Sequence, residues 1–211
     1  VLGHSWGTMV ALAMGLQQPD VVRGLVLLSG YYYPSARLDA VAISPPAVPV
    51  IGDLMRYTVS PLFSRLLWPG LSKKVFSPRR VDERFDRFPV WMALRPKQLR
   101  ASAAESALMV PAAISLSRRY AELKVPVVIL AGTQDKIVDC GHNSERLHER
   151  LQGGPHPSRL ELARGVAHMT PYAHPEKVMA ATDEIPAQVG EPLHRRTPEA
   201  EALARASESG V

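Results

Sequence analysis

The sequence of 211 residues has a single cysteine, Cys140, and no long apolar run. One cysteine cannot form an intrachain disulfide, which is typical of a reducing compartment and favours a cytoplasmic location. A transmembrane helix needs about 18 consecutive apolar residues, so we expect no membrane span. The first residues also lack the charged and apolar regions of a signal peptide.

Other signatures are also missing. No glycine-rich nucleotide-binding loop occurs, the single cysteine offers no metal-binding spacing, and the arginines show no glycine-aromatic RNA-binding pattern. We therefore expect no cofactor, no metal ion and no nucleic-acid partner. For Cys140, a small semi-buried residue at the start of a helix is a better interpretation than a thiol nucleophile or a redox sensor.

The composition is that of a soluble globular protein, with 46% hydrophobic and 21% charged residues. The net charge of +5 is unevenly distributed. Residues 34–120 contain 14 Lys and Arg against 6 Asp and Glu, a net charge of +8, and the rest of the chain carries −3. Such a basic section can attract an anionic substrate or an acidic surface, although a solvated helical surface is the simpler interpretation.

Short apolar runs alternate with helical patterns. Runs rich in β-forming residues predict buried parallel strands, and an alternating segment predicts a strand nearer an edge. The predicted strands cover residues 22–29, 125–132 and 158–163, and the predicted helices cover residues 8–17, 143–151 and 176–185. This alternation indicates an α/β architecture.

Residues 34–120 interrupt this alternation. They contain nine prolines from Pro45 to Pro111, with helical pieces such as residues 51–67 and 97–108 among them. This pattern predicts a helical insertion into the α/β core. From Pro186 onward the sequence is polar and rich in alanine, so we expect residues 186–211 to form a loosely ordered tail.

The start of the chain carries Gly3-His4-Ser5-Trp6-Gly7, which fits the motif G-x-S-x-G. This motif is typical of a sharp strand-to-helix turn that exposes a serine hydroxyl in a strained conformation. Glycines on both sides remove Cβ atoms that would collide across the turn. The following helix directs its N-terminal dipole towards Ser5, and the N–H of Trp6 becomes a natural oxyanion donor. The alternative is a glycine-rich turn with an idle serine.

A nucleophilic serine needs a base, and the base needs an orienting acid. In the chain order Ser…Asp…His, Asp135 follows the strand at residues 125–132, and His168 lies in the loop after the last predicted strand. Weaker candidates exist for both roles. Asp139 and Asp39 are the alternative acids. Of the other histidines, His4 is expected to pack beneath the serine turn, His142 to cap a helix or lie exposed, and His174 to lead into the last helix.

The segments GHSWG, GTQDKIV and GVAHMTPYAHPEKV together resemble the α/β-hydrolase fold family over about residues 1–185, in its capped, esterase- or epoxide-hydrolase-like branch. The resemblance implies that Ser5 is the nucleophile, Asp135 the acid and His168 the general base. It also implies the C-terminal part of a doubly wound, mostly parallel sheet. Residues 1–33 and 121–185 would form this core, and residues 34–120 the helical cap.

The nucleophile type narrows the implied chemistry. Relatives that open epoxides or cleave carbon–halogen bonds carry aspartate where this chain has Ser5. Serine instead favours acyl transfer, such as hydrolysis of an ester, thioester, lactone or amide of a small to medium apolar substrate. A second hypothesis is a non-catalytic protein of the same fold that binds a ligand or partner under its cap, and a third is a decayed remnant.

Two further expectations concern the cap and the start of the chain. Tyr31, Tyr32 and Tyr33 stand where the cap begins, and they form either an aromatic wall that binds substrate or a packing contact between cap and core. Trp68, Trp91, Met92 and Met109 could line an apolar pocket, although plain core packing is the more common role for each. Because Val1 and Leu2 resemble the end of a strand that precedes the motif, we expect the chain to be an N-terminally truncated hydrolase that is inactive and poorly soluble alone. The second oxyanion donor would lie upstream.

Overall fold

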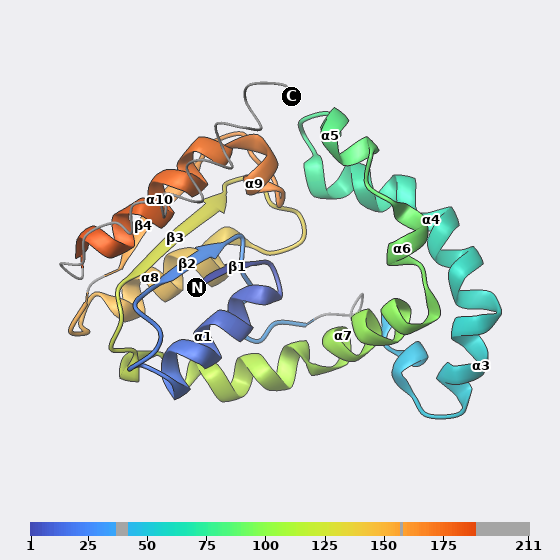
Figure 1. Ribbon diagram of the computed structural model, residues 1–211, viewed down its shortest axis with the longest axis horizontal. Helices are drawn as coiled ribbons and strands as arrows, with labels where there is room; N and C mark the ends of the chain where they lie inside the picture. Colours follow the sequence, from blue (N-terminus) through green and yellow to red (C-terminus); the bar gives the residue numbers. More distant parts are fainter. Residues whose placement is uncertain (37–41, 157, 189–211) are drawn as a thin grey trace, which may run out of the picture.

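The computed structural model describes residues 1–36, 42–156 and 158–188 (Figure 1). Asp39 and residues 189–211 of the predicted tail lie outside this part of the chain. The elements in chain order are β1 (Leu2–His4), α1 (Gly7–Gln17), β2 (Leu25–Leu28), η1 (Pro45–Ala47), α3 (Ile51–Tyr57), α4 (Val59–Phe76), α5 (Glu83–Asp86), α6 (Val90–Ala93), α7 (Pro96–Ser117), η2 (Tyr120–Glu122), β3 (Val127–Gly132), η3 (Gly141–Glu145), α8 (Arg146–Leu151), β4 (Arg159–Ala163), α9 (Thr170–Ala173) and α10 (Pro175–Gln188).

The four strands of the described chain form one parallel sheet in the order β1-β2-β3-β4. The register pairs Gly3 with Leu27, Leu27 with Ile129, and Ile129 with Leu160. Because all the strands run in the same direction, their carboxyl ends lie at one edge of the sheet. The predicted α/β fold with a parallel sheet is confirmed.

Helices cover both faces of this sheet, as Figure 1 shows. Successive residues of β2 point to opposite faces, so Leu25 and Leu27 pack in a core with α1 and α8, and Val26 and Leu28 pack in a second core with α10. Burial on both faces explains why β2 is a continuous apolar run. β2 and β3 are shorter than predicted, because their pairing begins at Leu25 and Val127 and so leaves out residues 22–24 and 125–126.

The segment from η1 to α7 is entirely helical or irregular in its described part, and Figure 1 shows it as an arc beside the sheet. The predicted helix at residues 51–67 is divided into α3 and α4 at Thr58. Pro61 gives the physical reason, since a proline ring clashes with the carbonyl four residues earlier and is best tolerated in the first turn of a helix. Pro61 therefore ends one helix at Tyr57 and lies in the first turn of the next.

Two other prolines do not end helices. Pro69 lies inside α4 and Pro111 inside α7, so α7 continues well beyond the predicted residues 97–108. Helix α10 likewise includes Pro186 and ends at Gln188, three residues into the segment predicted as a tail. Whether this helical segment is a separate cap domain stays a prediction.

Candidate active site

Ser5 lies at the sharp turn between β1 and α1. Its φ of 54° is in the left-handed region, which costs energy for a residue other than glycine. Its N–H donates to the Leu28 carbonyl at 2.9 Å, which continues the pairing of β1 with β2. The carbonyl of Ser5 accepts from the Thr8 N–H at 3.1 Å and from the Thr8 hydroxyl at 2.6 Å. These contacts hold the strained backbone in place.

The two glycines of the motif differ in their surroundings. A Cβ on Gly3 would lie 2.5 Å from the Gly7 carbonyl oxygen and 2.8 Å from the Thr8 nitrogen, both of which are backbone atoms. A Cβ on Gly7 would have no atom within 4 Å. The turn therefore requires glycine at position 3 only, and the expectation that both glycines prevent a collision is wrong for Gly7.

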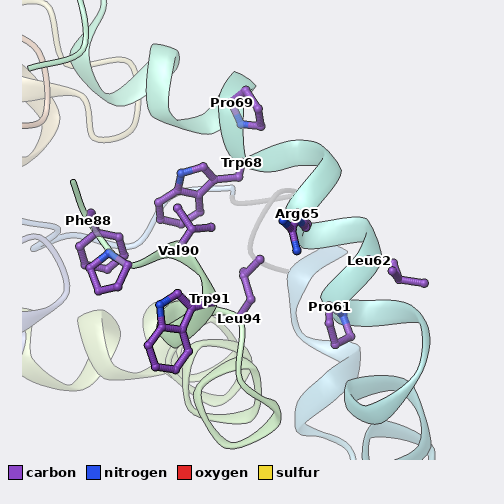
Figure 2. A pocket seen from close by; sticks show the side chains of 10 residues that line it. Pro61, Leu62, Arg65, Trp68, Pro69, Phe88, Val90, Trp91 and Leu94 are labelled. Carbon is purple, nitrogen blue, oxygen red and sulfur yellow. The ribbon is translucent and has the colours of Figure 1, made fainter. Parts of the chain in front are cut away.

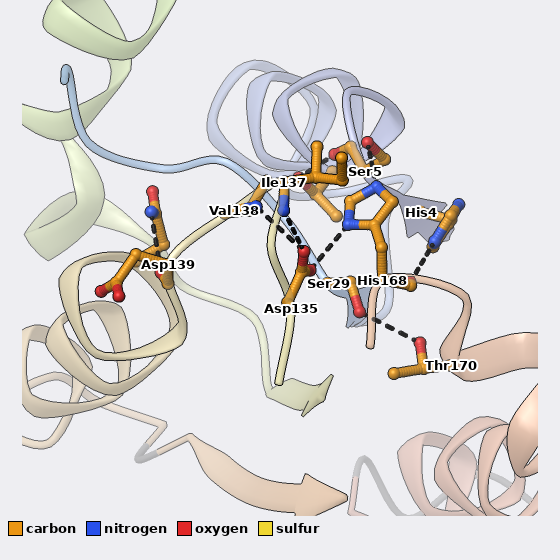
Figure 3. A network of polar contacts seen from close by, with 11 residues as sticks. His4, Ser5, Ser29, Asp135, Ile137, Val138, Asp139, His168 and Thr170 are labelled. Atoms are coloured by element: carbon orange, nitrogen blue, oxygen red, sulfur yellow. Dashed lines mark hydrogen bonds and ion pairs between the residues drawn. The ribbon is translucent and has the colours of Figure 1, made fainter. Parts of the chain in front are cut away.

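Ser5, His168 and Asp135 form a continuous chain of hydrogen bonds (Figure 3). The Ser5 Oγ is 2.8 Å from His168 Nε2, and His168 Nδ1 is 2.7 Å from Asp135 Oδ2. With neutral imidazole protonated at Nδ1, the serine hydroxyl donates to Nε2 and Nδ1–H donates to the carboxylate. The side chains of His168 and Asp135 are only 6% and 3% exposed, so the hydrogen bond between them is shielded from water. The structure thus brings the three residues of the predicted triad together.

The Asp135 carboxylate is oriented by its own loop. Its Oδ1 accepts from the Ile137 and Val138 N–H groups at 2.8 and 3.0 Å, which leaves Oδ2 for His168. Asp139 is directed elsewhere, because its Oδ1 accepts from the His142 N–H at 2.6 Å, and Figure 3 shows it apart from the other residues of the network. Of the two acids in this loop, Asp135 is the one that contacts the histidine.

The loop that carries His168 packs against the end of β3. A Cβ on Gly132 would overlap the carbonyls of Val166 and Ala167, so glycine is needed for the close approach. His4 fixes the loop from the other side, since its Nε2–H donates to the His168 carbonyl at 3.0 Å. The pKa of His4 is lowered, first by burial and second by the neighbouring His168, so this donor stays neutral.

The remaining candidate residues lie away from Ser5. His142 Nε2 contacts the Pro34 carbonyl at 3.2 Å, and His174 Nδ1 lies 2.8 Å from the Glu176 carboxylate. Burial and nearby acidic residues raise the pKa of the Cys140 thiol to about 11. A protonated thiol is a poor nucleophile, which favours a packing role for Cys140.

The three consecutive tyrosines are buried in two different places. Tyr31 joins an apolar cluster that includes Met9, Val138 and Trp6, directly beside the triad residues. Tyr32 and Tyr33 belong to the main core instead, where they are 0% and 6% exposed. Contact of these tyrosines with a substrate stays a prediction, and Tyr31 is the best placed of the three.

Sequence reasoning missed two supporting residues. The side-chain oxygen of Asn143, in η3, accepts from the Tyr32 and Tyr33 N–H groups at 2.8 and 3.1 Å and so ties the tyrosine segment to the acid loop. The indole N–H of Trp6 donates to the Glu105 carbonyl of α7 at 3.0 Å and so connects the serine turn to the helical segment. No local pattern indicates either contact, because both join residues far apart in the chain.

Two cavities are relevant to a substrate, one beside the acid loop and one within the helical segment. One of about 390 Å³ borders the acid loop, and its lining includes Tyr31 and Asp135. Another, of about 590 Å³, lies between α4 and α6 (Figure 2). Its lining is Pro61, Leu62, Arg65, Trp68, Pro69, Phe88, Pro89, Val90, Trp91 and Leu94. Of the four residues suggested for an apolar pocket, Trp68 and Trp91 line this cavity and Met92 and Met109 do not. Ser5 borders neither cavity.

Residues 1–36, 42–156 and 158–188 contain no group of three or more His, Cys, Asp and Glu side chains placed to hold a metal ion. Over the same ranges, every helix is too short or too polar to cross a membrane.

A parallel sheet covered by helices on both faces, with a strained serine between β1 and α1, defines an α/β-hydrolase fold. The family described as serine aminopeptidase, S33 matches residues 1–172, and the chain belongs to this family. The resemblance drawn from the sequence is therefore confirmed. No curated protein matches the sequence significantly.

Solved structures agree on the fold. An α/β-hydrolase-fold protein from Burkholderia ambifaria has a TM-score of 0.68 at 17% identity, and the match covers 87% of this chain and 64% of that one. A hydrolase from Pseudomonas aeruginosa PA01 has a TM-score of 0.65 at 18% identity, with 87% and 63% covered. A monoacylglycerol lipase from Paleococcus ferrophilus has a TM-score of 0.51 at 20% identity, with 87% and 66% covered. This chain thus spans less than two thirds of these structures.

Proposed function

We propose that this chain carries the catalytic triad of a serine hydrolase that cleaves an ester or a related acyl bond. The observation that carries the proposal is the unbroken path from the Ser5 hydroxyl through both nitrogens of His168 to the Asp135 carboxylate, at 2.8 and 2.7 Å. The 2.8 Å distance is within hydrogen-bond reach for transfer of the serine proton to His168 Nε2. The expected cytoplasmic location stays a prediction.

In the proposed reaction, the Ser5 oxygen attacks the carbonyl carbon of the substrate and its proton moves to His168 Nε2. The carboxylate of Asp135 holds the imidazole in the required tautomer and stabilises its positive charge. His168 then gives the proton to the leaving alcohol or amine, and an acyl-serine remains. Water activated by His168 hydrolyses this intermediate and restores the free hydroxyl.

The negative oxygen formed during each attack needs hydrogen-bond donors. The N–H of Trp6 is the proposed donor, because Trp6 is the N-cap of α1 and lies at the positive end of the helix dipole. Tyr31 is the proposed contact for the apolar part of the substrate. The helical segment 34–120 is proposed as the cap, which Trp6 joins to the serine turn through its contact with Glu105.

A fluorophosphonate probe tests the proposal, since it reacts covalently with activated serines. We expect the full-length protein to be labelled at Ser5, and Ser5→Ala to abolish labelling and to lower turnover by about 10⁶. Ser106→Ala is the matched control, because Ser106 is partly exposed and its hydroxyl donates to the Ser102 carbonyl within α7. Labelling that survives in Ser5→Ala would refute the assignment.

The same protein should then be offered p-nitrophenyl esters and amino-acid p-nitroanilides. Turnover that depends on Ser5 with either series supports acyl-bond hydrolysis and distinguishes esters from amides. A folded protein that neither reacts with the probe nor hydrolyses either series would instead support the non-catalytic binding protein.

A further inference from the structure

Helix α4 carries its apolar residues on the side that faces solvent. Six of them recur at spacings of three and four residues, and each is about half exposed or more: Val59 60%, Leu62 73%, Phe63 59%, Leu66 77%, Leu67 52% and Leu71 49%. Residues at this spacing lie on one face of a helix. We call these six residues the apolar face of α4.

The opposite side of α4 already has its contacts within the molecule. Ser72 and Phe76 are buried, and the Trp68 ring stacks on Phe85 and Phe88. In Figure 2, Leu62 points away from the rings of Trp68 and Trp91 that border the cavity. Figure 1 also places α4 at the outer edge of the molecule, on the side away from the sheet. The apolar face is therefore not part of the core of this chain.

A contiguous exposed apolar surface of this kind indicates a binding site, whereas single exposed apolar residues are normal. In an ordinary surface helix the apolar stripe faces the core and charged residues face water. In α4, an 18-residue helix, the apolar stripe faces water instead. Such a helix is about 27 Å long, which is enough for an extended contact.

The charges of α4 indicate what covers this face. The helix contains Arg65, Lys73 and Lys74 but no Asp or Glu. Lys73 and Lys74 follow Leu66 and Leu67 by seven residues, so the two lysines lie on the same face at its C-terminal end. Arg79 and Arg80 come next in the chain and are exposed. The apolar face thus ends in a group of cations.

We propose that the apolar face of α4 binds an anionic lipid surface, with the helix lying in the plane of the interface. Leucine and phenylalanine side chains enter the boundary between headgroups and acyl chains, and lysines next to them pair with anionic headgroups. A second copy of this chain fits less well, because α4 has no carboxylate to offer these lysines. On α3, Asp53 is already paired with Arg56.

This proposal is independent of the hydrolase assignment, because its test measures binding and not turnover. The full-length protein is sedimented with vesicles of pure phosphatidylglycerol and with vesicles of pure phosphatidylcholine, at low and high salt. We expect binding to phosphatidylglycerol that weakens as salt rises, and little binding to phosphatidylcholine.

Variants assign the binding to α4. Phe63→Ser with Leu66→Ser should weaken binding at least tenfold through lost apolar burial. Lys73→Gln with Lys74→Gln should weaken it by roughly 30-fold, since each cation near an anionic surface contributes about a fivefold factor. The matched control is Val21→Ser, because Val21 is 75% exposed but follows α1. All of these positions face solvent, and circular dichroism checks that each variant is folded.

Four results would overturn the proposal. The first is absence of binding to phosphatidylglycerol vesicles, and the second is equal binding to both lipids. The third is binding that the α4 variants do not weaken relative to Val21→Ser. The fourth is a dimer, detected by light scattering, that the double substitution Phe63→Ser with Leu66→Ser dissociates. This result would mean that the apolar face of α4 binds a second copy of this chain.

Discussion

At the residue scale, the turn at Ser5 depends on one glycine and not on the other. Gly3→Ala places a Cβ against the backbone of Gly7 and Thr8, which can move only if the turn opens. We expect this change to lower the free energy of unfolding by about 2–4 kcal/mol and to abolish labelling of Ser5. Gly7→Ala meets open space at the first position of α1 and should leave stability unchanged or raise it by up to about 1 kcal/mol.

Urea denaturation of both variants, with fluorophosphonate labelling of each, measures this difference. Comparing Gly3→Ala with Gly7→Ala shows whether the turn is disrupted by a steric clash at one position or by any substitution in the motif. Equal damage from the two substitutions would mean that the turn does not have the geometry described.

Asp135 and Asp139 offer a second matched pair. Asp135→Asn replaces the acceptor for His168 Nδ1–H with an amide that favours the wrong imidazole tautomer, so turnover should fall by up to about 10⁴. Asp139→Asn keeps an oxygen that can accept from the His142 N–H, and turnover should change less than tenfold. Ester hydrolysis at saturating substrate checks both. Loss of turnover in Asp139→Asn alone would assign the acid to that residue.

The residues of this site show which contacts can be predicted from the sequence and which cannot. Ser5, Asp135 and His168 were predictable because each follows a strand, and the ends of parallel strands meet at one edge of a sheet. The hydrogen bonds of His4 and Asn143 were not, because the carbonyl and N–H groups that they bind lie about 110 to 160 residues away in the chain. Their roles depend on loops whose paths no local pattern specifies.

At the scale of elements, an ion-pair network joins β4 to α10. Glu161 pairs with Arg159 at 2.9 Å and with Lys177 at 2.7 Å, and Arg159 also contacts Glu184 at 2.6 Å. The hydrogen bonds from Arg159 and Lys177 lower the pKa of Glu161. The network therefore stabilises the contact between an edge strand and the helix that covers one face of the sheet.

Glu161→Gln should destabilise the protein by about 0.5–1 kcal/mol near neutral pH, a modest value because the groups are partly exposed. Since the folded pKa lies below the unfolded value, this stabilisation is present above the unfolded pKa and is lost as pH falls through the folded one. The difference from wild type should thus shrink below about pH 4.

Urea unfolding at neutral and acidic pH measures the effect, with Glu83→Gln on α5 as the control. Glu83 forms no ion pair within the described chain. A difference for Glu161→Gln that persists unchanged in acid would show that the charge is not its source.

Helices and strands could be predicted where apolar residues follow a regular pattern along the sequence. The apolar run of β2 identifies a strand buried on both faces, and the pattern of α1 identifies its helix. The break at Thr58 follows from Pro61, but the helical continuation through Pro69 and Pro111 does not follow from any single residue. At those positions neighbouring helical turns and packing outweigh the missing N–H.

At the scale of the whole molecule, burial is concentrated in the sheet. Residues of β2 and β3 are at most 3% exposed, and both strands are paired on two sides. The long helix α4 buries only Ser60, Ser72 and Phe76, and α3 buries only Gly52. Both the sheet and the helices α3 and α4 have regular hydrogen bonds. Local opening of β2 or β3 exposes more buried apolar surface than local opening of α3 or α4, so it costs more free energy.

Hydrogen exchange should reveal this difference in the full-length protein without lipid. We expect the amides of β2 and β3 to exchange only through global unfolding, and those of α3 and α4 to exchange at least tenfold faster through local opening. Exchange followed by mass spectrometry of peptides gives the rates, and β4, which Figure 1 places at the edge of the sheet, provides an intermediate reference. Amides of α4 that exchange as slowly as those of β3 would mean that a contact outside the described chain already protects this helix. Such a result would direct the search for a partner to the apolar face of α4.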